Sequence, residues 1–115
     1  MISVPLGVRV YLACGTTDMR RGMDGLAMVV QQVLAEDPFG GAVYAFRGRR
    51  GSLLKLLWHD GIGLCLLVKR LERRHFVWPM TSTGAVSLTS AQLATLLEGC
   101  EWRASVYSRR PELAG

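Results

Sequence analysis

The chain has 115 residues, half of them apolar, which is enough for one hydrophobic core and excludes a chain that is disordered throughout. Lys and Arg total 14 against 9 Asp and Glu, so the net charge is +5, and all but two of the basic residues are arginine. The planar arginine fork matches phosphate and carboxylate, so this bias favours an anionic partner, although a basic protein without such a partner would have the same composition.

The cysteines are odd in number and far apart, at Cys14, Cys65 and Cys100, which is typical of free thiols in a reducing compartment. No Cys or His spacing resembles a zinc motif or an activated nucleophile, so we expect no metal, no cofactor and no catalytic residue. The first residues lack the pattern of a signal peptide, and the apolar runs are too short to span a bilayer. The expected protein is cytoplasmic, does not bind a membrane and takes no small-molecule substrate.

The first half of the chain predicts a strand, a long helix and another strand. β-forming residues dominate 8–13. Apolar residues then recur every three or four positions through 18–36, which predicts one helix, capped by Thr16 or Thr17 and ended by Asp37-Pro38. The pattern changes to that of a strand at 42–46.

The second half predicts a series of strands and a final short helix. Strands are expected at 53–59 and 62–69 with a tight turn at Asp60-Gly61, and a further short strand at 75–78. Thr89 and Gln92 have the spacing of a capping box that starts the last helix, and Gly99 ends it.

Tight links between consecutive strands favour antiparallel pairing, because parallel pairing needs a long crossover. We therefore predict an α+β fold. A single antiparallel β-meander sheet packs against one long N-terminal helix and one short C-terminal helix, with both helices on the same face. The compact domain is expected over 1–102, followed by a flexible tail over 103–115.

Basic residues gather in the predicted connections and form the candidate nucleic-acid site. If the connections at 47–51 and 69–74 emerge at the same end of the meander, their side chains form one positive edge that can hold phosphates. The alternative is a set of solvated loop charges. The candidate residues are Arg20, Arg21, Arg47, Arg49, Arg50, Lys55, Lys69, Arg70, Arg73 and Arg74.

Other side chains have a structural interpretation that is at least as good as a functional one. Trp58, Phe76, Trp78 and Trp102 could stack on bases, but Trp58 and Trp78 lie in apolar strand runs that favour the core. A metal-dependent nuclease needs converging carboxylates. The acidic residues instead fall at helix ends and turns, so the sequence predicts no enzyme.

Several motifs in order carry a resemblance to a known family. The chain reads TDMRRGMDGL from Thr17, WHDGIGLCL from Trp58, KRLE from Lys69 and FVWP from Phe76. In this it resembles the TnpB-type accessory protein of the IS-66 family of bacterial insertion sequences, which is unrelated to the RNA-guided nuclease of the same name. The matched positions are Asp18, Met19, Arg20, Gly22, Trp58, Asp60, Gly61, Lys69, Arg70 and Leu71.

The resemblance implies a protein needed for DNA transposition beside a separate transposase that cuts the DNA. The leading hypothesis is a non-catalytic accessory factor that binds the DNA backbone through the arginine-rich connections, with little sequence specificity. The alternative is a protein–protein scaffold that docks on the transposase or another element-encoded protein without contacting DNA. Neither hypothesis fixes the oligomeric state.

Overall fold

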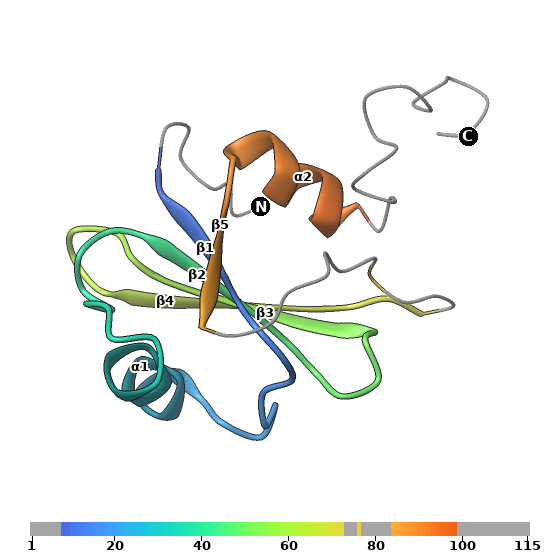
Figure 1. Cartoon of the computed structure of the whole chain (residues 1–115), viewed down its shortest axis with the longest axis horizontal. Coiled ribbons are helices and arrows are strands. Elements are labelled where there is room, and N and C mark those ends of the chain that lie inside the picture. The colour runs from blue at the N-terminus through green and yellow to red at the C-terminus, as the bar shows by residue number, and fades with distance from the viewer. Residues whose placement is uncertain (1–7, 73–75, 77–83, 99–115) are drawn as a thin grey trace.

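The structure is a computed structural model that describes residues 8–72, 76 and 84–98. These residues form a five-stranded sheet with one helix on each side (Figure 1). In chain order the elements are β1 (Val10–Ala13), α1 (Met23–Gln32), β2 (Val43–Arg47), β3 (Leu53–His59), β4 (Leu64–Arg70), β5 (Ala85–Leu88) and α2 (Ser90–Leu97).

The sheet is mixed, so the prediction of a purely antiparallel meander is wrong. Its order is β4-β3-β2-β1-β5, and β1 pairs with β2 in parallel while the other pairs are antiparallel. The segment between β1 and β2 contains α1 and is long enough for the crossover that parallel strands require. The meander is therefore confined to β2, β3 and β4.

The β3–β4 hairpin is the longest paired unit of the sheet. Its register runs from Leu53 opposite Arg70 to His59 opposite Leu64. The turn between them is held by the Asp60 carboxylate, whose Oδ1 accepts from the backbone N–H groups of Ile62 at 2.8 Å and Gly63 at 2.9 Å. Gly61 takes a positive φ of 99°, which favours glycine. The predicted hairpin after His59 is confirmed, but its connection spans four residues, 60–63, and the second strand begins at Leu64 instead of Ile62.

The two helices cover opposite faces of the sheet, which corrects the expectation of a shared face. Leu26 and Val30 of α1 are fully buried against Tyr44, Phe46 and other residues of one face. On the other face, Leu93 and Leu96 of α2 pack on a second apolar cluster that contains Trp58. Because strand side chains alternate, each buried strand supplies both clusters.

The first helix is shorter than the sequence predicts, and the two helices are similar in length. The N-cap residue of α1 is Gly22, and no side chain caps the helix there. Thr16 and Thr17 therefore do not cap it. The helix also ends before Asp37-Pro38, because Ala35 already has a positive φ of 55°. In α2, by contrast, the predicted capping box of Thr89 and Gln92 is confirmed, with both reciprocal hydrogen bonds present.

Strand β5 was not predicted, and it extends the sheet beyond β1. The expected strand at 75–78 and the tail at 103–115 lie outside the described residues, apart from the buried Phe76. In the described part of the chain, no helix is long and apolar enough to cross a membrane.

Candidate nucleic-acid interface

Three segments that are distant in sequence meet at one end of the sheet. The N–H of Thr17, which precedes α1, donates to the carbonyl of Arg47 at the end of β2, at 2.9 Å. At the end of β4, the N–H of Leu71 donates to the carbonyl of Ser52 in the β2–β3 turn, also at 2.9 Å. The connections at 47–51 and after 69 therefore lie side by side, as the hairpin geometry predicts.

This convergence brings exposed arginines together along one edge, which we call the cationic rim. Its members are Arg20, Arg21, Arg49, Arg50 and Arg70, and each of them is exposed. All five were predicted as nucleic-acid-binding residues. Arg73 and Arg74 were predicted as well, but they lie outside the described residues.

The β2–β3 turn presents two of these arginines. The N–H of Gly51 donates to the carbonyl of Gly48 at 3.1 Å, which closes a four-residue turn with Arg49 and Arg50 at its centre. Gly51 has a positive φ of 76°. Gly48 packs closely, because a Cβ on it would lie 3.0 Å from the Cγ atom of Met19, which would have to shift. The turn thus holds two guanidinium groups outward while its backbone packs against the Thr17–Arg21 segment.

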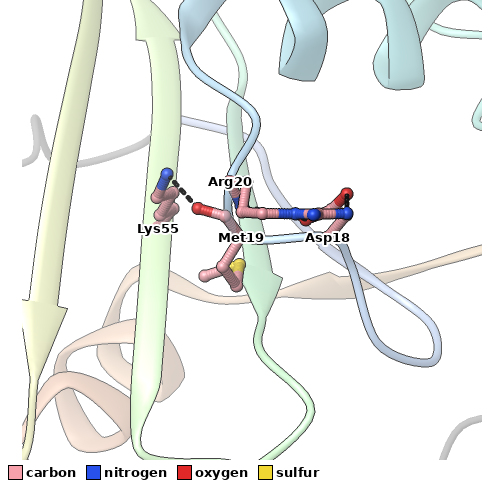
Figure 2. A network of polar contacts seen from close by, with 4 residues as sticks. All are labelled: Asp18, Met19, Arg20 and Lys55. Carbon is pink, nitrogen blue, oxygen red and sulfur yellow. Dashed lines mark hydrogen bonds and ion pairs between the residues drawn. The ribbon is translucent and has the colours of Figure 1, made fainter.

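Lys55 is not part of the rim, which corrects its prediction as a DNA contact. It is only 8% exposed, on the α1 face of β3. Its Nζ donates to the carbonyls of Met19 at 2.7 Å and Arg21 at 2.8 Å, and Figure 2 shows the ammonium pointing at the first of these. A buried ammonium needs such partners. Lys55 therefore fastens the segment that carries Arg20 and Arg21 to the sheet.

Arg20 forms a two-pronged ion pair with Asp18 within that segment (Figure 2). Nε donates to Oδ1 at 3.0 Å and Nη2 to Oδ2 at 2.9 Å, and the backbone N–H of Arg20 also reaches Oδ1. The side-chain hydrogen bond from Arg20 lowers the pKa of Asp18 from 3.8 to about 2. Arg20 remains 91% exposed, so most of its five donors face solvent.

Lys69 and Arg47 lie on the other face of the sheet, the face that α2 covers. The Lys69 Nζ donates to the carbonyl of Leu97 at 2.6 Å, at the negative C-terminal end of α2. Arg47 is half-buried and pairs with Leu54, a core residue of that face. Neither side chain belongs to the exposed rim, and a DNA contact of Lys69 or Arg47 stays a prediction. Both lysines of the chain thus serve to fix backbone segments, whereas the arginines of the rim are presented to solvent.

A half-open hollow of about 500 Å³ adjoins the rim. Its lining residues are Thr16, Thr17, Asp18, Met19, Arg20 and Arg49. The two threonine hydroxyls were missed as candidate site residues, because their place before an apolar stripe indicated a helix cap. In the structure they stand beside guanidinium groups, where hydroxyls can share an anion with arginine.

The matched family positions outside the rim have structural roles. Gly22 precedes the first turn of α1, Trp58 is buried in the α2-side core, and Leu71 supplies a backbone bond to the β2–β3 turn. Asp60 and Gly61 shape the β3–β4 turn. The same motifs that carry the resemblance therefore assemble the frame behind the rim.

The opposite end of the sheet carries carboxylates. Glu36, Asp37 and Asp60 lie there. The rings of Phe39 and His59 meet edge to face, with their centroids 5.9 Å apart. Backbone hydrogen bonds from Gly63 and Ile62 lower the pKa of Asp60. Burial and the hydrogen bond to Asp60 raise the pKa of the Cys65 thiol, which lies 3.5 Å from that carboxylate. A raised pKa is the opposite of what a nucleophilic thiol requires.

Comparison with known proteins identifies relatives over nearly the whole chain. An uncharacterized protein of Sinorhizobium fredii (strain NBRC 101917 / NGR234), y4hO, is 50% identical over 108 residues, which cover 94% of each chain. A second protein of that strain, y4jC, is 34% identical over 102 residues, covering 89% of this chain and 87% of the relative. No solved structure matches. The family model described as IS66 Orf2 like protein matches residues 8–106, which confirms the resemblance in the motifs, and the chain belongs to this family.

Proposed function

We propose that the protein is a non-catalytic accessory factor in DNA transposition, and that its cationic rim holds the phosphate backbone of DNA. The observation that carries the proposal is the convergence of five exposed arginines from three segments that are bonded to one another. Family membership supports the link to transposition.

The rim is suited to phosphate because its backbone is fixed before any ligand binds. Lys55 ties down the Thr17–Arg21 segment, and backbone bonds join the β2–β3 turn to the end of β4. Little ordering of the chain is then needed on binding, which reduces the entropic cost of association. Guanidinium groups can hold phosphate oxygens with paired hydrogen bonds.

Two carboxylates on the segments that carry the rim arginines reduce the positive charge of the rim. Asp18 pairs with Arg20, and Glu72 follows the end of β4. The exposed arginines still outnumber these carboxylates, so the rim attracts a polyanion. Contacts of this kind go to the backbone, and we expect little discrimination between DNA sequences.

Fluorescence anisotropy with labelled duplexes at several salt concentrations tests the proposal. An element-end duplex and a random duplex should bind with similar affinity. The slope of log K against log salt should be about −4 if roughly four phosphates are neutralised. Absence of binding to both duplexes at low salt would reject the proposal.

The scaffold alternative makes a different prediction with the same residues. If the rim meets an acidic surface of the transposase, co-purification of the two proteins survives nuclease treatment and is lost in Arg49→Ala/Arg50→Ala. A transposase complex that survives this double substitution, together with loss of DNA binding, favours the DNA proposal.

The proposed absence of catalysis also has a direct test. The raised pKa of Cys65, caused by burial and the hydrogen bond to Asp60, argues against a thiol nucleophile. Labelled element ends incubated with the protein and magnesium should remain intact. Cleavage that disappears on addition of a chelator would instead indicate a nuclease.

A further inference from the structure

Within residues 8–72, 76 and 84–98, the backbone groups along the outer edge of β4 have no hydrogen-bonding partner. β4 is the last strand on its side of the sheet. The backbone hydrogen bonds Leu71–Ser52 and Asp60–Gly63 show which opposed residue pairs of β3 and β4 exchange hydrogen bonds. Hydrogen-bonded pairs alternate with non-hydrogen-bonded pairs in antiparallel strands. The N–H and C=O groups of Cys65, Leu67 and Lys69 therefore point toward β3. The N–H and C=O groups of the alternate residues point outward from the sheet; these residues are Leu64, Leu66, Val68 and Arg70.

The middle of this edge lacks the features that usually prevent strand pairing. Exposed edges are commonly protected by charges, proline or bulges. From Leu64 to Val68 the strand has none of these. Val68 is 51% exposed, and Ile62 in the adjoining turn is 95% exposed. The edge therefore combines free backbone groups with uncovered apolar side chains.

We infer that β4 pairs antiparallel with β4 of a second copy of this chain, about a two-fold axis that passes beside Leu66. In this register, Leu66 faces Leu66 of the partner subunit, and Leu64 faces Val68 of the partner subunit. These residues have outward backbone groups, so each opposed pair exchanges two hydrogen bonds. The inference depends on the β4 edge alone and does not require DNA binding.

The charges at the two ends of β4 favour a second copy as the occupant. The strand has Asp60 in the turn before it, and Lys69, Arg70 and Glu72 at its end, where the two basic residues outnumber the one carboxylate. Antiparallel pairing brings the basic end of one copy toward the acidic turn of the other. The two Arg70 residues lie eight residues apart along the strand direction, or about 26 Å, which is beyond the screening length of physiological salt.

The register follows from the pairing of apolar with apolar residues. A two-fold axis beside Leu67 would oppose Arg70 to Leu64 of the partner subunit. An axis beside Cys65 would leave Val68 opposite the turn residue Ile62 of the partner subunit. Only the register about Leu66 opposes all the outward apolar residues of the strand to one another.

Analytical ultracentrifugation of the full chain tests the inference through a matched pair of variants. Wild type and Val68→Thr should both show a dimer at micromolar concentration. Val68→Pro removes an N–H that faces away from β3, so the fold of one copy is retained. Two intermolecular hydrogen bonds are lost, one from each copy, and self-association should weaken about thirtyfold or more.

Disulfide trapping tests the register independently. In Leu64→Cys/Val68→Cys, oxidation should give a dimer on a non-reducing gel, because each new thiol opposes one on the partner. Each single variant, like wild type, should stay monomeric on the gel, since identical positions lie about 13 Å apart along the strand. A monomeric wild type at every concentration tested, or trapping that is equal in single and double variants, overturns the inference. If Val68→Pro does not fold, Val68→Lys replaces it and must also weaken the dimer.

Discussion

The two ends of the sheet differ in charge although the same strands form both. At one end, the segment before α1, the β2–β3 turn and the end of β4 present the arginines of the cationic rim. At the other end, the loop after α1 and the β3–β4 turn present Glu36, Asp37 and Asp60, with the exposed rings and methyl groups of Phe39 and Ile62. The sheet thus separates charges that are interspersed in the sequence.

Strand direction explains this separation. In the meander of β2, β3 and β4, alternate connections emerge at the same end of the sheet. The parallel pairing of β1 with β2 then brings the segment after β1 to the end at which β2 finishes. A modest net charge can therefore produce a positive edge, and the proposed DNA binding should depend on that edge more than on the total charge.

The largest expected effect is on DNA affinity at the rim. Arg49→Ala/Arg50→Ala/Arg70→Ala should weaken binding at low salt about a hundredfold and reduce the salt slope by about three. Arg9→Ala is the matched control, because it removes an exposed arginine at the opposite end of the sheet. The DNA affinity of this variant should stay within about twofold of the wild-type value. Equal losses per arginine in both variants would mean that net charge alone governs binding.

The next effect is on stability, and it separates a buried cation from an exposed one. Lys55→Met leaves the carbonyls of Met19 and Arg21 without their donor. The free energy of unfolding should fall by about 2 kcal/mol in urea titrations. Arg50→Met should change it by less than about 0.5 kcal/mol, since its side chain is exposed. Equal stability of the two variants would contradict the anchoring role of Lys55.

A smaller effect is expected from a methyl group added at either end of the sheet. Gly48→Ala places a Cβ against Met19 and should cost about 1 kcal/mol of unfolding free energy while disturbing the Thr17–Arg21 segment. Gly63→Ala meets no atom within 4 Å and needs no positive φ, so thermal unfolding should show no loss. An unchanged stability of Gly48→Ala would show that Met19 yields to the added methyl group without cost.

The smallest effect concerns the acid range. The pKa of Asp18 is about 2 in the folded protein, against an ordinary value of 3.8, and the hydrogen bond from Arg20 is the main cause. The pair therefore stabilises the fold fully above the higher value, and its contribution is lost as the pH falls through the lower one. Carboxyl ¹³C NMR should give a midpoint near 2 for Asp18, and Arg20→Ala should shift it back toward 3.8. An unchanged midpoint would exclude the two-pronged pair.

Local signals predicted the hairpin and the last helix because their determinants are adjacent in sequence. Asp60 and Gly61 shape one turn, and Thr89 and Gln92 form one cap. The parallel β1–β2 pair depends instead on a contact across the whole of α1, which no local pattern records. The extra length predicted for α1 arose because Met19 continued the apolar stripe, whereas its carbonyl binds Lys55.

The rim was predicted in part for the same reason. Hairpin topology placed Arg49, Arg50 and Arg70 at one end correctly. Lys55 was misassigned, although it lies in a strand that is apolar on both sides of it, a pattern typical of a strand covered on both faces. Lys69 could not be assigned from sequence, because its partner carbonyl belongs to the distant α2.

The most direct measurement is the ¹H–¹⁵N spectrum of the protein titrated with a short duplex at low salt. Binding at the rim predicts shifts for the amides of Arg20, Arg49, Arg50 and Arg70 and unchanged signals for Phe39 and Ile62. Shifts that centre on the acidic end, or a spectrum that does not respond to DNA, would contradict the account.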